Sequence, residues 1–321
     1  MFPEKKVLMA DKKLIASALL PPIIVIAYSL YFKVDPIGII YEFPPYFLFA
    51  FLGSYLASNA VASLRDYLLA KVPYRVALKA RLLGNAVSLL IPGALGADLT
   101  RALVYTEATR KRLEESLAVS TVSAFYDVVI GSLMYLALLI VRPSLFDLIY
   151  ALIAVGNVLF WFVVIGYAAG TAKLGLNRVE RMILGRLKDY PEVEAAYLRA
   201  KEVIRTRNAG PLVLIYSLLT VLQFLIQAIP LVFVFKSYLI ALMVNQLYFV
   251  SLLVLIPAGA ISSEIALSSV LPPLYAIGIR TLELISYASG FVFIKDLNLK
   301  QMEEELRRYG KVPKRAPKGE G

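Results

Sequence analysis

The chain has 321 residues, of which 59% are hydrophobic and only 18% are charged, whereas soluble domains carry roughly 25% charged residues. The formal net charge is +11, but the basic residues lie between and after long apolar blocks. That arrangement is typical of a membrane protein and speaks against nucleic acid as a partner. The chain has no cysteine and no histidine, which excludes disulfides, thiol chemistry and histidine catalysis, and we expect neither metal nor cofactor.

Four apolar blocks contain no charged residue: 14–32, 46–64, 148–172 and 211–235. Each is about as long as a helix that crosses ~30 Å of hydrocarbon. They predict an all-α, polytopic membrane bundle that forms a single domain over residues 1–321. Lys and Arg in the short loops place both termini on the cytoplasmic side of the cell membrane, and make 65–81 a cytoplasmic loop.

The block 82–99 differs from a plain span, because Pro92-Gly93 interrupts it and the basic loops 65–81 and 101–112 flank it on both sides. Proline lacks the amide donor and glycine permits a sharp turn. We therefore expect a re-entrant hairpin that enters from the cytoplasmic side, followed by an outward span over 117–141.

The stretch 173–209 carries apolar residues at helical spacing between many basic ones. It predicts two short amphipathic helices, split at Pro191, in a cytoplasmic linker on the membrane surface or on the bundle. A plain structural linker fits the same pattern equally well.

A second broken segment, 238–274, is interrupted at Pro257-Ala258-Gly259. The last span, 275–294, then leads into a basic cytoplasmic tail, 295–321. A cytoplasmic tail requires this second broken segment to begin and end on the outside.

The halves 14–141 and 148–294 share one order of elements, namely span, span, broken hairpin, span. Each half crosses the membrane three times, so the two halves are expected in opposite orientation, as an inverted-topology internal repeat. Interrupted segments at corresponding places in two halves indicate the binding site of a transporter. In both halves a Pro/Gly break precedes a carboxylate, Asp98 or Glu264, by about two helical turns.

An ionisable side chain at the bilayer centre costs on the order of 3 kcal/mol or more, which makes such residues functional candidates. The candidate substrate- or ion-binding residues are Asp98, Arg101, Asp127, Glu264, Arg280, Glu283 and Asn85. The candidate helix-break residues are Pro92, Gly93, Gly96, Pro257 and Gly259.

Structural roles stay open for most of these residues. Asp98 and Arg101 fit an interfacial ion pair, and Arg280 and Glu283 fit an internal pair, because each couple is three residues apart on a helix. Glu264 could lie near the outer surface. The amides Asn59, Asn85, Gln223 and Asn245 are more often interhelical hydrogen-bond partners than ligands.

Residues 92–102, PGALGADLTRA, resemble the PG..G.D..RA signature of the flippase-like transmembrane domain family, which includes the membrane region of lysylphosphatidylglycerol synthases. Asp127 resembles the family's aspartate in the next span, 256–264 its second Pro/Gly-acid segment, and Arg280 the arginine that opens its last span. The resemblance covers roughly 14–295. It implies lipid translocation, without the aminoacyltransferase domain of the synthases.

The leading hypothesis is a non-enzymatic lipid flippase that moves a phospholipid or a polyprenyl-linked lipid across the cell membrane. Membrane lipids would be its partners, together with lipid-modifying or glycosyltransferase enzymes. An ion-coupled transporter of a small solute uses the same repeat. An intramembrane aspartyl protease, built on Asp98 and Asp127, is the least favoured alternative, and a non-catalytic scaffold for glycosyltransferases is another.

Overall fold

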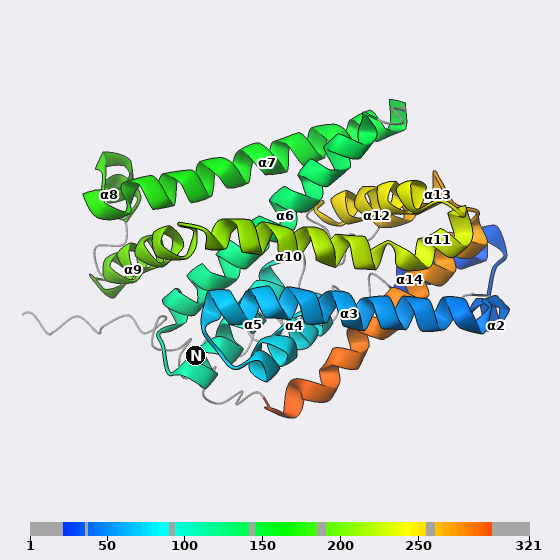
Figure 1. The fold of residues 1–321 in the computed structure, drawn as a ribbon, viewed down its shortest axis with the longest axis horizontal. Helices are drawn as coiled ribbons and strands as arrows, with labels where there is room; N and C mark the ends of the chain where they lie inside the picture. The colour runs from blue at the N-terminus through cyan, green and yellow to red at the C-terminus, as the bar shows by residue number, and fades with distance from the viewer. Residues whose placement is uncertain are drawn as a thin grey trace, which may run out of the picture.

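The computed structural model describes residues 22–35, 38–89, 94–140, 145–184, 191–254 and 261–296. Every regular element within these ranges is a helix (Figure 1), as predicted. The elements are Pro22–Phe32, α2 (Gly38–Glu42), α3 (Pro45–Ala70), α4 (Tyr74–Ser88), α5 (Ala94–Thr109), α6 (Leu113–Leu139), α7 (Leu145–Thr171), η1 (Ala172–Leu174), α8 (Arg178–Leu184), α9 (Pro191–Arg207), α10 (Leu212–Gln227), α11 (Ile229–Phe235), α12 (Tyr238–Leu252), α13 (Ser262–Ser268), α14 (Pro273–Ala288) and η4 (Ser289–Asp296).

Within the described ranges, five helical segments are long and apolar enough to cross a membrane. They are Pro45–Ala70, Leu113–Leu139, Leu148–Leu174, Leu212–Phe235 and Pro273–Ile294. Pro22–Phe32 and Tyr238–Leu252 are shorter apolar helices. The prediction of a polytopic membrane protein is confirmed, since large apolar side chains also cover the outside of the bundle, where lipid replaces water.

Prolines and left-handed residues set the ends of the long helices. α3 begins at Pro45, whose missing amide would have had no helical partner in the first turn. It ends at Ala70, and the next residue, Lys71, caps it with a φ of 56° and a backbone N–H donated to the carbonyl of Tyr67. α14 likewise begins at Pro273, and Ser237 caps α12 by accepting from the backbone N–H of Ile240.

Helix α6 organises the bundle, because it contacts α3, α5, α7, α9, α10 and α12. α4 packs along α5, and α3 packs along α10 (Figure 1). Gly84 permits the first contact, since a β-carbon at this residue would lie 3.1 Å from the backbone oxygen of Ala97. These pairs bring polar residues of α3, α4, α5 and α6 into one interior region.

Two helices, α8 and α9, occupy the stretch for which two short helices were expected, and α9 begins at Pro191. Glu180 on α8 anchors them. It accepts hydrogen bonds from Lys201 and Tyr197 on α9, each at 2.8 Å, and from the backbone N–H of Asn177. The side of the membrane on which they lie stays a prediction.

The predicted loops at 65–81 and 101–112 are largely wrong. α3 continues to Ala70, α4 begins at Tyr74, and α5 continues to Thr109. Arg65, Arg81 and Arg101 are buried and not at the surface of loops. Helix continues through these charges because carboxylates within the bundle neutralise them.

The predicted break residues Pro92, Gly93, Pro257 and Gly259 lie outside the described residues. Gly96 is described, and its carbonyl accepts a hydrogen bond from Thr100 within α5. The re-entrant hairpins and the inverted repeat therefore stay predictions.

Candidate functional site

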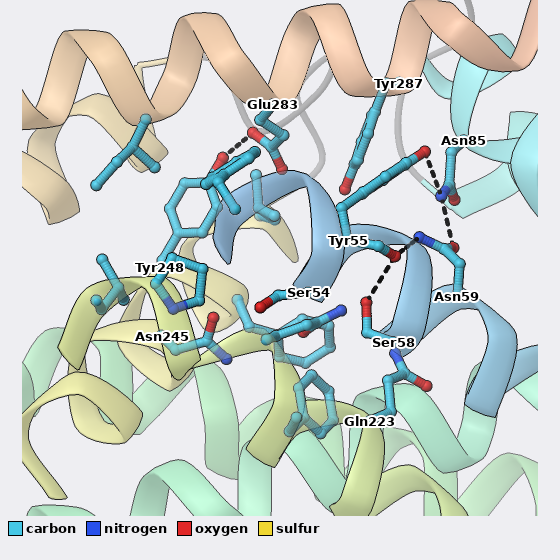
Figure 2. Close-up of a pocket in the computed structure, with 18 of the residues that line it drawn as sticks. Ser54, Tyr55, Ser58, Asn59, Asn85, Gln223, Asn245, Tyr248, Glu283 and Tyr287 are labelled. Atoms are coloured by element: carbon cyan, nitrogen blue, oxygen red, sulfur yellow. Dashed lines mark hydrogen bonds between the residues drawn. The ribbon is translucent and has the colours of Figure 1, made fainter. Parts of the chain in front are cut away.

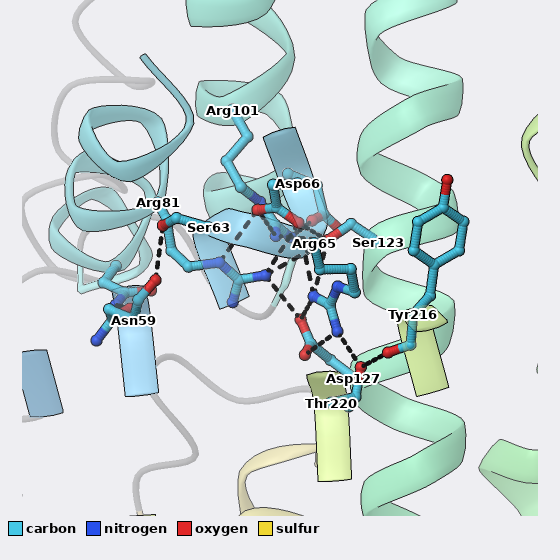
Figure 3. A network of polar contacts seen from close by, with 12 residues as sticks. Asn59, Ser63, Arg65, Asp66, Arg81, Arg101, Ser123, Asp127, Tyr216 and Thr220 are labelled. Carbon is cyan, nitrogen blue, oxygen red and sulfur yellow. Dashed lines mark hydrogen bonds and ion pairs between the residues drawn. The ribbon is translucent and has the colours of Figure 1, made fainter. Parts of the chain in front are cut away.

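Three arginines and three aspartates from α3, α4, α5 and α6 form the first ion cluster, and Figure 3 labels the three arginines with Asp66 and Asp127. Its members are Arg65, Asp66, Arg81, Asp98, Arg101 and Asp127. The formal charges of these six side chains cancel. Such balance matters inside a membrane bundle, because an uncompensated buried charge destabilises a fold by several kcal/mol.

Arg65 lies at the centre of this cluster and is fully buried. Its two terminal nitrogens donate to the two carboxylate oxygens of Asp127, each at 2.9 Å. The same nitrogens also donate to Thr220 and Ser123. This two-pronged geometry suits a planar guanidinium and not an ammonium.

Asp66, adjacent in sequence, is the second acceptor of the first ion cluster. Arg81 donates to it at 3.1 and 3.3 Å, Ser123 at 2.6 Å and Tyr105 at 3.3 Å. A nitrogen of Arg101 lies 3.6 Å from it. An aspartate with this many donors is held as a carboxylate, so it acts as a fixed negative charge that positions the arginines.

Asp98 and Arg101 form the ion pair that their spacing predicted, and Arg101 also donates to Ser123 at 3.1 Å. The pair is part of the first ion cluster and is not an isolated ion pair. Asp127 is bound by Arg65 and, at 3.3 Å, by Arg81. Arginines thus engage both aspartates on which an aspartyl protease would depend.

The second ion cluster consists of Glu264, Arg280 and Glu283, with Tyr248. Arg280 donates through Nε to Glu264 at 3.0 Å and through Nη1 to Tyr248 at 2.8 Å. It also pairs with Glu283, as predicted from their spacing, and the Tyr248 hydroxyl donates to the same carboxylate. Glu264 is buried here, so it does not lie on the surface of the protein.

A cavity of about 250 Å³ lies between the two clusters (Figure 2). Asp127 and Arg81 contribute to its wall from the first ion cluster, and Glu283 and Tyr248 from the second. Its other lining residues are Phe51, Ser54, Tyr55, Ser58, Asn59, Asn85, Gln223, Phe224, Gln227, Pro230, Leu231, Asn245, Phe249, Leu252, Leu267, Ile279 and Tyr287.

Amides and hydroxyls make up most of the polar part of this wall. Asn85 donates to Asn59 at 3.0 Å and to the hydroxyl of Tyr55 at 3.4 Å (Figure 2). Within the part of the chain that the structure describes, Oε1 of Gln223 and Nδ2 of Asn245 have no hydrogen-bond partner. Both side chains are buried, with 6% and 9% exposed.

Of the predicted site residues, Asn85, Asp127 and Glu283 line the cavity. Asp98, Arg101, Glu264 and Arg280 are not among its lining residues and lie in the two clusters behind its wall. Sequence reasoning missed several participants: Arg65, Asp66, Arg81, Tyr248 and the cavity amides other than Asn85. Arg65 and Asp66 could have been found from the apolar pattern of their helix, which continues past Leu64.

Among the described residues, no group of three or more acidic side chains could hold a metal ion. The carboxylates instead face arginines and hydroxyls.

Comparison with known proteins agrees with the sequence motifs. A family model described as "Lysylphosphatidylglycerol synthase TM region" matches residues 14–295. No curated protein and no solved structure matches the chain. Because the match covers most of the chain, the chain belongs to the lysylphosphatidylglycerol synthase TM-region family, as the resemblance had predicted.

Proposed function

We propose that this member of the lysylphosphatidylglycerol synthase TM-region family is a lipid translocator, which moves a polar-headgroup lipid across the cell membrane. The lipid would be a phospholipid or a polyprenyl-linked lipid. The headgroup would enter the cavity between the two ion clusters, while the hydrocarbon tail stays in the bilayer. No chemical step is part of this proposal.

The observation that carries the proposal is a cavity with polar groups in its wall, inside a bundle of membrane-spanning helices. A headgroup that crosses the bilayer needs hydrogen-bond partners in place of water, because unsatisfied polar groups cost several kcal/mol in hydrocarbon. The amides and hydroxyls of Asn59, Asn85, Gln223 and Asn245 and of Ser54, Ser58 and Tyr55 supply such partners. The volume of about 250 Å³ suits a headgroup and not a whole lipid.

The two ion clusters support the same proposal as positioning elements. They hold α3, α4, α5 and α6 on one side of the cavity, and α12, α13 and α14 on the other. Rigid walls keep the lining groups in place, so the headgroup would meet a preformed set of partners.

An ion-coupled transporter of a small solute is the second candidate. The observation that favours it is the composition of the second ion cluster, where two carboxylates, Glu264 and Glu283, pair with one arginine. Such an excess of acid in a membrane interior is suited to carrying a proton or binding a cation.

The orientation with both termini in the cytoplasm belongs to the proposal, because it follows from loop charges. The proposed partners, membrane lipids and the enzymes that modify or glycosylate them, belong to the proposal as well.

The test is equilibration of an acyl-labelled fluorescent lipid between the two leaflets of proteoliposomes, followed with a membrane-impermeant quencher. Wild-type protein is expected to speed equilibration at least tenfold over protein-free vesicles. Asp127→Asn, which removes one charge from the cavity wall, is expected to lose most of this gain. Glu202→Gln makes the same chemical change in an exposed ion pair on α9, and should equal wild type.

Two results would contradict lipid translocation through this cavity. One is equilibration by wild-type protein at the protein-free rate. The other is unchanged equilibration with Asp127→Asn that elutes and melts as a folded protein. Solute uptake by the same vesicles without lipid movement would favour the second candidate.

A further inference from the structure

The cavity wall carries little net charge with which to attract a phosphate. Arg81 is the only basic residue among the described lining residues. Asp66 and Asp127 both accept from its guanidinium, at 3.1 to 3.3 Å, so its charge is already matched. Arg65, Arg101 and Arg280 do not line the cavity.

The carboxylates of the wall act against an anion as well. Asp127 and Glu283 both line the cavity, and like charges repel strongly where water is excluded. Arg65 and Arg280 match these two carboxylates, just as two aspartates match Arg81. A phosphate inside would therefore meet no unmatched positive charge. The electrostatics favour a group without negative charge.

The unpartnered amides narrow the choice between a cation and a neutral group. Gln223 leaves an acceptor oxygen and Asn245 leaves a donor nitrogen, both buried in the wall of the same cavity. A buried polar group without a partner costs about 1–3 kcal/mol. An ammonium group donates only, whereas a hydroxyl both donates and accepts. Both orphaned atoms are fully enclosed, so the two amides would have to turn them into the cavity, where a hydroxyl can pair with either one.

The aromatic lining fits the same class of ligand. Phe51, Tyr55, Tyr248, Phe249 and Tyr287 line the cavity beside the amides and serines. Their rings offer apolar faces to carbon-bound hydrogens, while the amides and hydroxyls meet oxygens. A compact group with hydroxyls around a carbon ring presents both kinds of surface.

We propose that the cavity binds an uncharged, hydroxyl-rich group, a sugar or a cyclic polyol, at the end of a lipid headgroup. This inference rests on the proposed function for the lipid part, since a free sugar has the same chemistry. Gln223 and Asn245 would be its specificity-determining residues.

The experiment compares three acyl-labelled lipids with identical chains in phosphatidylcholine proteoliposomes: a monoglucosyl-diacylglycerol, a phosphatidic acid and a phosphatidylethanolamine. Wild-type protein is expected to move the glucosyl lipid at least tenfold faster than the other two. The double variant Gln223→Leu/Asn245→Leu is expected to lose that preference. Gln246→Leu is the matched control, because Gln246 is a neighbouring buried amide that does not line the cavity.

A binding arm separates this inference from the proposed function. Saturation transfer from the protein in nanodiscs to the sugar protons of the glucosyl lipid is measured, with methyl glucoside as a soluble competitor. Binding that the double variant loses, without lipid movement, supports the sugar site and contradicts translocation. Equal binding or transport of phosphatidic acid, a double variant that keeps the preference, or no binding at all would overturn the sugar site. Equally strong binding of methyl glucoside would assign the site to a free sugar.

Discussion

Arg65 donates from both terminal nitrogens to the two carboxylate oxygens of Asp127, and both distances are 2.9 Å. The pair joins α3 to α6 across 62 residues of sequence. It lies at the cavity wall, where Asp127 retains some exposure while Arg65 has none. This ion pair, which links two helices, thus also places the carboxylate of Asp127 beside the proposed ligand.

The first prediction concerns this pair. Arg65→Met should destabilise the protein by about 3–5 kcal/mol, because it leaves buried carboxylates without a matching charge. Arg65→Met/Asp127→Asn should lose less than the sum of the two single variants, since residues in one network couple. Thermal unfolding in detergent measures all four proteins. Additive losses would show that the two side chains do not interact energetically.

The second prediction concerns the geometry of Arg280. Arg280→Lys keeps the charge but has one nitrogen, which cannot occupy the positions of both Nε, which donates to Glu264, and Nη1, which donates to Tyr248. We expect a loss of about 1–3 kcal/mol in the free energy of unfolding. Arg205→Lys, in a partly exposed pair with Glu202, should stay within about 0.5 kcal/mol of wild type. Equal melting temperatures for the two variants would contradict this account.

The third prediction concerns close packing at Gly290. A β-carbon there would lie well inside van der Waals distance of the backbone oxygen of Leu82, so η4 could not keep its place against α4. Gly290→Ala should cost about 1–3 kcal/mol. At Gly156 a β-carbon meets nothing within 4 Å, and Gly156→Ala should be neutral or slightly stabilising. Denaturant titration of the two variants measures the free energy of unfolding of each. Equal values for the two variants would contradict close packing at Gly290.

The fourth prediction concerns acid stability at Glu180, outside the membrane spans. Burial acts to raise the pKa of this carboxyl, but hydrogen bonds from Lys201, Asn177 and Tyr197 outweigh it and lower the pKa from 4.5 to about 2. A depressed pKa contributes stability that is fully present above pH 4.5 and is lost as pH falls toward 2.

Hydrogen exchange of α8 and α9 between pH 6 and 2 checks this contribution. In wild type, protection should fall across the window. Glu180→Gln should already be less protected at pH 6 and change less on acidification. Matching pH profiles would show that Glu180 does not anchor the two helices.

Local spacing predicted part of the site. Asp98–Arg101 and Arg280–Glu283 are three residues apart, so one turn of helix brings each couple together. The long apolar blocks likewise predicted the spans, because crossing hydrocarbon dictates length and composition.

Contacts between distant segments could not be predicted in this way. Arg65 and Arg81 adjoin apolar blocks, where loop charges are also found, so they were assigned to a loop. Only the packing of α3, α4 and α6 shows that they face Asp127. For Gln223 and Asn245, the sequence did not separate an interhelical hydrogen bond from an open cavity position. That distinction depends on which atoms remain unpartnered after packing.

The cancelled charges of the first ion cluster have an electrical consequence. A transmembrane voltage does work of about 2.3 kcal/mol per 100 mV on each elementary charge that crosses the field. Three arginines and three aspartates that shift together carry no net charge, so the voltage does no net work on their joint displacement. The first ion cluster would therefore add no voltage dependence to a rearrangement in which its six side chains move together.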